Sequence, residues 1–351
     1  MLEKPNLDDA RIIDRLHDIY GLGLLITAVE FLPLGADANT AVYRVTTVDA
    51  MYFLKLRSGV FEEMSVIVPA LLQQQGMTQV IAPIITQSGQ LWGQLDQFAV
   101  ILYPFIEGQD GYTVTLTDQH WMEFGRALKS LHSATLPPSV TSRIQRETYS
   151  GHWRETVKDF QTQLETQDFS DPVSVQLTDL LKTHRNVIDH LITRAEQLAV
   201  LLQKDVPEFV LCHADIHAGN FLITPDGTLY IVDWDTIILA PKERDLMFVG
   251  GGLQGGSRTP QEEKTLFMKG YGYTDIDPVA LAYYRYERIV QDIAAYCVEI
   301  LLTDPSSADR AVSLRYLRGQ FKPNEVIDIA CQTEKHLPHF LQSPFTFNPG
   351  L

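Results

Sequence analysis

A polar loop between two short apolar runs carries the residues whose types and spacing best fit a chemical role. Asp215 and Asn220 lie in that loop, and Asp233 follows the next apolar run. Between them, the segment 224–227 (TPDG) has the composition of a hairpin turn, because Pro presets φ and Gly tolerates a positive φ. We therefore expect two short strands that bring these three polar side chains to neighbouring ends.

Two carboxylates and one carboxamide in this arrangement fit phosphoryl transfer from a nucleotide. Asp215 would act as the catalytic base, since its carboxylate would orient the attacking hydroxyl and accept its proton. The oxygens of Asn220 and Asp233 would hold Mg²⁺, a hard cation that prefers oxygen ligands, against the phosphates. His213 is expected to hold the loop through its imidazole.

The same segment also fits two other classes of protein. A metal-dependent hydrolase is one alternative, with five candidate ligands: His213, Asp215, His217, Asp233 and Asp235. The first three form the pattern H-x-D-x-H, which offers imidazole and carboxylate ligands at short spacing. Such sites usually draw on a second histidine cluster, and the other histidines of this chain are scattered. A nucleotide-binding module without catalysis is the third alternative. The joint presence of Lys55, Asp215, Asn220 and Asp233 weakens it.

Composition limits the kind of partner. The chain has 351 residues and a net charge of −16, so we expect no nucleic acid, because binding a phosphate backbone needs clustered Lys and Arg. A cationic small molecule fits this acidic chain better. Cys212, Cys297 and Cys331 are too far apart for a disulfide framework or a C-x-x-C metal motif, which fits a reducing compartment.

We do not expect the N-terminal segment to be a secretory leader. Acidic residues outnumber basic ones before the apolar run at 20–29, whereas a secretory leader begins with positive charge. We interpret that run as the start of the first strand. No apolar run reaches transmembrane length, so a cytoplasmic protein without membrane contact is expected.

Periodicity predicts strands in the first third of the chain and mainly helices after it. An amphipathic helix is expected over 8–20, and strands near 25–33, 41–48, 51–57, 79–86, 90–95 and 97–103. Further helices are expected over 117–133, around 153–164, as one long element over 173–203, and near 260–272, 278–302 and 307–319.

Two motifs, taken together, resemble those of a known enzyme family. H-x-D-x-x-x-x-N at 213–220, followed by D-W-D at 233–235, resembles the catalytic and metal-binding loops of kinase-like phosphotransferases. The form HADIHAGN is similar to that of the aminoglycoside phosphotransferase family, which acts on small molecules. The resemblance covers most of the chain and includes GADANT (35–40), YPFIEG (103–108), APKERDLMFVGGG (240–252) and YRYERIVQD (284–292).

The resemblance implies an α+β, two-lobed protein-kinase-like fold that uses ATP and Mg²⁺ as cofactors. Residues 1–103 would form a small nucleotide-binding lobe around an antiparallel sheet. Residues 104–351 would form a larger, mainly helical lobe for catalysis and substrate binding. The hinge would lie near 103–108, where the Pro104 carbonyl and the Ile106 amide would bind adenine.

Lys55 lies inside an apolar strand, and a buried ammonium is costly unless it is paired. The resemblance implies that Lys55 contacts nucleotide phosphates beneath the loop 35–40 and pairs with a carboxylate on the next helix. That helix would begin near residue 61, and the resemblance aligns Glu63 with the carboxylate. Pro69 should kink or shorten the helix. An edge-strand lysine that faces water is the alternative for Lys55.

For the acceptor site, the resemblance implies Asp235, Glu287 and Asp292 as substrate-binding residues. An acidic and aromatic wall suits protonated amines, although a solvated helix with internal ion pairs fits the spacing of Glu287 and Asp292 equally well. Asp235 fits a substrate-facing role and a loop-solvating role equally.

The implied reaction is phosphorylation of a hydroxyl on a small cationic acceptor. An aminocyclitol or aminoglycoside antibiotic, spectinomycin first, is the expected substrate, and antibiotic resistance would be the consequence. A kinase for a metabolite such as choline, homoserine or a sugar is the alternative, since the shared motifs do not choose between acceptors. We expect a monomer or a weak homodimer.

Overall fold

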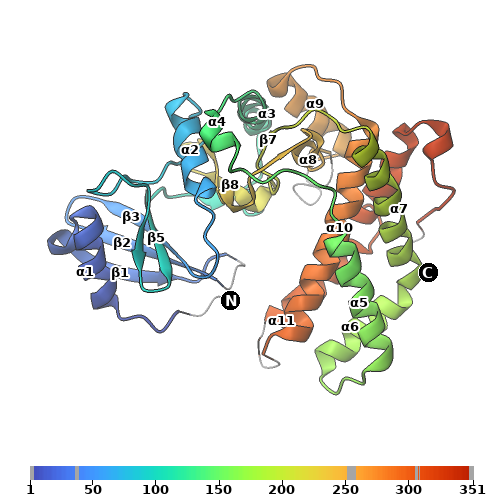
Figure 1. The fold of residues 1–351 in the computed structure, drawn as a ribbon, viewed down its shortest axis with the longest axis horizontal. Coiled ribbons are helices and arrows are strands. Elements are labelled where there is room, and N and C mark those ends of the chain that lie inside the picture. Colours follow the sequence, from blue (N-terminus) through green and yellow to red (C-terminus); the bar gives the residue numbers. More distant parts are fainter. Residues whose placement is uncertain (1–3, 36–38, 251–257, 305–306, 308, 348–351) are drawn as a thin grey trace. The chain divides into compact units, whose positions relative to one another are not determined.

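An antiparallel sheet forms the first part of the chain, as the alternating apolar residues predict (Figure 1). Its five strands run in the order β1-β2-β3-β5-β4. They are β1 (Ile26–Leu32), β2 (Thr40–Thr47), β3 (Met51–Arg57), β4 (Gly93–Leu95) and β5 (Phe98–Pro104). Helix α1 (Asp9–Tyr20) is capped by Asp8 and buries Ile12 and Leu16 in the same core as Leu54 and Leu56 of β3.

The computed structural model describes residues 4–35, 39–250, 258–304, 307 and 309–347. The centre of the expected phosphate loop, residues 36–38, lies outside the described residues. The chain divides into two compact units. The first comprises Met1–Gln145, His213–Ile237 and Lys269–Tyr271, and the second Arg146–Cys212, Ile238–Met268 and Gly272–Leu351. The lobe boundary at residues 103 and 104 stays a prediction.

The prediction of a strand over 79–86 is wrong. This segment is irregular, with an isolated bridge between Val80 and Ile231 and one hydrogen bond from Ile84 N–H to the Leu102 carbonyl (2.7 Å). Pro83 lies within it and has no N–H to give to a ladder, which disfavours a regular strand.

Helix α2 (Met64–Gln74) begins three residues later than expected and contains Pro69 without ending there. Pro69 has no N–H for the carbonyl four residues earlier, so the helix loses one ladder bond. Seven of its residues are buried, among them Val66, Val68 and Leu72, and this packing holds the helix together across the proline. Glu63 becomes the N-cap residue rather than a helical one.

The hairpin predicted around 224–227 is confirmed. Strands β8 (Phe221–Ile223) and β9 (Leu229–Ile231) pair antiparallel, and β6 (Gln109–Asp110) joins them as an edge strand. Thr224 N–H donates to the Thr228 carbonyl across the turn (3.0 Å), and Gly227 takes the positive φ of 85° that the turn requires.

Helix α3 (Asp118–His132) supports the hairpin from the same unit. Thr117 and His120 form its capping box. His120 Nδ1 accepts from Thr117 N–H, so Nε2 carries the proton and donates to the Gly227 carbonyl (2.9 Å). Phe124 packs on Phe221 with ring centroids 4.9 Å apart. The turn is thereby fixed to a helix end.

The second unit is mainly helical. Its long helix α10 (Pro278–Leu302) packs against α5 (His152–Thr166) and α7 (Arg185–Lys204), as Figure 1 shows. The other elements of the unit are α6 (Pro172–Thr183), α8 (Glu243–Leu246), α11 (Asp309–Gln320), α12 (Val326–Thr333) and the pair β7 (Val210–Cys212) and β10 (Ile238–Ala240). The short α4 (Pro138–Thr141) belongs to the first unit, and α9 (Pro260–Tyr271) spans the boundary between the units along the chain.

The single long helix expected over 173–203 is two helices, α6 and α7, that meet at His184. No Gly or Pro marks this break in the sequence. The His184 ring stacks on Phe321 with centroids 4.2 Å apart, a tertiary contact that local propensity does not encode. In the part of the chain that the structure describes, no helix combines the length and the apolar character that a membrane crossing requires.

Candidate active site

The polar loop after Cys212 is fixed by the buried imidazole of His213. Its Nδ1 accepts the Asp215 backbone N–H (3.3 Å), so Nε2 carries the proton and donates to the Val232 carbonyl (3.0 Å). The Thr236 hydroxyl donates to the His213 carbonyl (2.7 Å), and the His213 ring packs on Trp234. His213 therefore ties the loop to the chain that follows β9.

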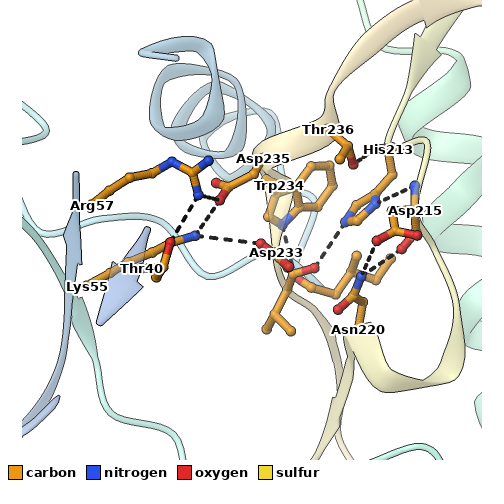
Figure 2. Close-up of polar contacts among 12 residues, drawn as sticks. Thr40, Lys55, Arg57, His213, Asp215, Asn220, Asp233, Trp234, Asp235 and Thr236 are labelled. Carbon is orange, nitrogen blue, oxygen red and sulfur yellow. Dashed lines mark hydrogen bonds and ion pairs between the residues drawn. The ribbon is translucent and has the colours of Figure 1, made fainter. Parts of the chain in front are cut away.

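Asn220 joins the two ends of the site. Its Nδ2 donates to the Asp215 carbonyl (2.7 Å) and lies 3.5 Å from Asp215 Oδ2. Val232 N–H donates to the Asn220 carbonyl (2.9 Å), which holds Asn220 beside the residue that precedes Asp233. The structure thus brings together Asp215, Asn220 and Asp233 at neighbouring ends of one hairpin, as Figure 2 shows.

Asp233 takes a left-handed backbone conformation, with φ of 63°. Non-glycine residues rarely adopt this region, and such strain is concentrated at functional sites. Trp234 holds the turn, since its Nε1–H donates to the Ile231 carbonyl (3.0 Å). The Asp233 side chain is about half exposed, 52%, and its Oδ1 lies 3.6 Å from Lys55 Nζ.

The residues present fit a magnesium ion. The Asp233 carboxylate is exposed beside Asn220, whose Oδ1 accepts no hydrogen bond from any residue that the structure describes. A carboxylate oxygen and an amide oxygen are the donors that a hard divalent cation prefers. Asn220 and Asp233 would hold the ion, which would neutralise charge on nucleotide phosphates when bound.

Lys55 points from β3 toward the same hairpin. Its Nζ lies 2.8 Å from Asp235 Oδ2, and Arg57 Nη1 lies 2.8 Å from the same oxygen (Figure 2). Lys55 is mostly buried and ion-paired, so the alternative of an edge-strand lysine that faces water is wrong. β3 lies between β2 and β5, and is not an edge strand.

The expected ion pair between Lys55 and Glu63 is absent from the described interactions of this structure. Lys55 pairs with the two aspartates of the hairpin instead, and Glu63 pairs with Arg143. The late start of α2 explains the difference, because Glu63 precedes the first helical residue and its side chain is 36% exposed. A nucleotide-binding role for Glu63 stays a prediction.

The expected adenine contacts lie at the end of β5. Pro104 is the last residue of that strand and pairs with Tyr52, and Phe105 N–H donates to the Met51 carbonyl (3.1 Å). Ile106 N–H makes no hydrogen bond within residues 4–35, 39–250, 258–304, 307 and 309–347. The adenine contacts of Pro104 and Ile106 stay a prediction.

Glu287 and Asp292 belong to the second compact unit, on α10. Glu287 is 8% exposed and pairs with Arg154, with Oε2 and Nη1 3.4 Å apart. Asp292 pairs with Arg288 (2.8 Å) and accepts from Gln320 Nε2 (3.1 Å). Burial raises the pKa of Glu287 to about 7, and the Arg154 charge opposes that shift. Their role toward an acceptor stays a prediction.

The hydrogen bonds of the two imidazoles argue against the hydrolase alternative. Both ring nitrogens of His213 are used, one by Asp215 N–H and one by the Val232 carbonyl. His217 Nδ1 accepts from Gly219 N–H (3.0 Å). Metal ligation needs a free nitrogen lone pair, so His213 offers none and the H-x-D-x-H pattern does not form a metal site here.

Sequence reasoning missed Arg57 and Tyr112. Arg57 stands two residues after Lys55 on a strand, so strand alternation alone places both side chains on one face. Tyr112 stacks on the His217 ring with centroids 5.9 Å apart, and His217 Nε2 lies 3.6 Å from Asp215 Oδ2. No local pattern signals the Tyr112 contact, because 105 residues separate the two rings along the chain.

Fold and site together define a kinase-like phosphotransferase. The sequence matches the phosphotransferase enzyme family over residues 30–281, and the chain belongs to that family. The expected kinase-like fold, the expected enzyme class and the resemblance to aminoglycoside phosphotransferases are thereby confirmed.

Solved structures add detail to this assignment. A spectinomycin phosphotransferase in complex with ADP and spectinomycin is 36% identical over 95% of this chain and 100% of its own, with a TM-score of 0.86. An AMP-bound complex of spectinomycin phosphotransferase is 35% identical over 91% of this chain and 97% of its own, with a TM-score of 0.81. A choline kinase from Streptococcus pneumoniae is 16% identical over 87% and 95%, with a TM-score of 0.56, and shows the fold alone.

We predict that Asp233→Ala abolishes the magnesium dependence of nucleotide affinity. Changes to outer-shell partners alone cost about 10–100-fold in metal affinity, so loss of a direct ligand should cost at least as much. Calorimetric titration of ATP with and without Mg²⁺ measures this. Asp226→Ala, at the far end of the same hairpin, is the control. An unchanged magnesium dependence in Asp233→Ala would place the ion elsewhere.

We also predict that Glu287 lowers stability at neutral pH. Its pKa of about 7 lies above the ordinary glutamate value, so the folded state binds more protons than the unfolded state between about pH 4.5 and 7. The unfolding free energy should therefore fall as the pH rises through that window.

Glu287→Gln should remove the contribution of Glu287 to the loss of unfolding free energy with rising pH. The difference in unfolding free energy between variant and wild type should grow by up to about 3 kcal/mol across the window. Urea unfolding at pH 4.5, 6 and 8 measures it. A variant that is less stable than wild type at pH 8 would show instead that the ionised pair with Arg154 stabilises the fold.

Proposed function

We propose that this chain transfers the γ-phosphoryl group of ATP to a hydroxyl of an aminocyclitol or aminoglycoside, with spectinomycin as the favoured acceptor. The observation that carries the proposal is the likeness to the spectinomycin phosphotransferase solved with ADP and spectinomycin, which extends over nearly the whole chain. The first unit supplies the residue types that such a reaction needs, Asp215, Asn220 and Asp233 at the hairpin and Lys55 on β3.

Asp215 is the proposed catalytic base. The loop is fixed by His213 and Asn220, so the Asp215 carboxylate is held without a large reorganisation when a substrate arrives. Because phosphoryl transfer has a loose transition state, the main task of Asp215 is to orient the acceptor hydroxyl and later to take its proton.

Lys55, Asn220 and Asp233 are proposed to hold the donor. Asn220 and Asp233 would bind Mg²⁺, which neutralises developing charge on the phosphates when bound. Lys55 would contact the phosphates from β3, while the Pro104 carbonyl and the Ile106 amide would bind adenine. On this proposal the nucleotide-binding lobe ends near residue 103.

The acceptor is proposed to be a small cation. The net charge of −16 favours cationic ligands over anionic ones. Spectinomycin carries two secondary amines that are protonated near neutral pH, so an acidic site would attract it. Phosphorylation would inactivate the antibiotic. An organism that carries this enzyme in its cytoplasm would therefore be resistant.

Turnover against a panel of acceptors tests the proposal. ATP consumption should be coupled to spectinomycin, to several aminoglycosides, to choline and to homoserine, each at the same concentration. We expect kcat/KM for spectinomycin to exceed that for choline and homoserine by at least about 100-fold, because a site built for one set of polar groups rejects compounds that lack them. Higher turnover with choline or homoserine would favour a metabolite kinase and contradict the antibiotic assignment.

We predict that Asp215→Asn lowers kcat by about 10²–10⁴-fold, the usual effect of losing a positioned base. ATP affinity should change little, since Asp215 is not among the proposed donor-binding residues. Steady-state kinetics with the preferred acceptor and calorimetry with ATP give the two measurements. Near-wild-type turnover in the variant would remove Asp215 from the mechanism.

A further inference from the structure

Two cations on β3 converge on one carboxylate oxygen. Lys55 Nζ and Arg57 Nη1 each lie 2.8 Å from Asp235 Oδ2. The three side chains are only 15–22% exposed. Arg57 Nη1 also donates to the hydroxyl of Thr40 (3.0 Å), the first residue of β2. Figure 2 shows the two cations extending from β3 toward Asp235.

This cluster is electrostatically suited to an anion. Lys55 and Arg57 bring two positive charges to one carboxylate oxygen of Asp235, and Asp233 lies 3.6 Å from the Lys55 ammonium. Two cations repel each other more strongly at a mostly buried site than in water, so an anion that takes the place of Asp235 between them is stabilised. A guanidinium presents a planar fork of donors that matches phosphate oxygens.

The position of Arg57 links three parts of the proposed nucleotide site. Its backbone pairs with Thr40, which ends the loop expected to cover the phosphates. Its side chain reaches Asp235, two residues beyond the proposed metal ligand Asp233. Lys55, on the same face of the same strand, is the proposed phosphate-binding lysine.

We propose that Arg57 is a second phosphate-binding cation of the nucleotide site. In this structure Asp235 is the counter-ion of Lys55 and Arg57, and a nucleotide phosphate takes its place when the donor binds. The inference rests on the proposed ATP-dependent function, and it gives Asp235 a role toward the nucleotide rather than toward the acceptor. Arg57 binds the phosphates and is not a catalytic base.

Calorimetry with a series of nucleotides tests the proposal without measuring turnover. ATP, ADP, AMP and adenosine should be titrated without Mg²⁺ into wild type and into Arg57→Ala. The variant should bind ATP and ADP about 10–100-fold more weakly, as expected for lost charge-assisted hydrogen bonds. Adenosine binding should change by less than about two-fold, because adenosine carries no phosphate for Arg57 to contact.

Two matched variants separate phosphate binding from folding. Arg11→Ala removes an exposed arginine of the same unit that is paired with Asp96, and it should leave the whole series unchanged. Arg57→Lys keeps the charge and should recover part of the ATP affinity. Unchanged ATP binding in Arg57→Ala, or an equal loss for ATP and adenosine, would overturn the proposal.

Asp235→Asn should change ATP affinity in the direction opposite to Arg57→Ala. Removing the competing carboxylate charge should tighten magnesium-free ATP binding several-fold and leave the acceptor KM unchanged. A raised acceptor KM with unchanged ATP binding would show that Asp235 faces the acceptor. If wild type binds ATP no more tightly than adenosine, the proposed ATP-dependent function itself fails, which is distinct from a failure of Arg57.

Discussion

The candidate site depends on two hydrogen bonds made by the backbone of one residue, Val232. Its carbonyl accepts from His213 Nε2–H (3.0 Å), and its N–H donates to the Asn220 carbonyl (2.9 Å). Both ends of the polar loop are thus fastened to the residue immediately before Asp233. Because a buried hydrogen-bonding group is costly to leave unpaired, the loop and the Asp233 turn form one cooperative unit, and Asp215 is held by the same contacts.

The aspartates that follow the hairpin also pair with two cations of β3. Lys55 and Arg57 both reach Asp235, and Lys55 lies 3.6 Å from Asp233, so the sheet supplies cations and the hairpin supplies anions. Ion pairs at a site of low exposure are stronger than those on the surface. The same arrangement explains why no pair between Lys55 and Glu63 is needed in this structure, since the hairpin aspartates already compensate the lysine charge.

The acidic residues expected to bind the acceptor have a different physical setting. Glu287 of α10 is buried beside Arg154 of α5, and burial raises the pKa of Glu287 to about 7. Asp292 is paired with Arg288 one helical turn away. Neither side chain is a simple solvated carboxylate, so measuring the stability of Glu287 variants as well as their kinetics separates a structural role from recognition of a cation.

Elements whose signals are local can be predicted from the sequence alone. The hairpin turn at 224–227 follows from turn chemistry, and most strands of the sheet follow from alternation of apolar residues. The set Asp215, Asn220 and Asp233 follows from spacing within one short segment. Only the tertiary structure sets the ion-pair partners of Lys55, the break at His184 and the contacts of Arg57 and Tyr112. These depend on which side chains meet across 100 or more residues of chain, and ion-pair partners are chosen by burial and distance, which no local pattern encodes.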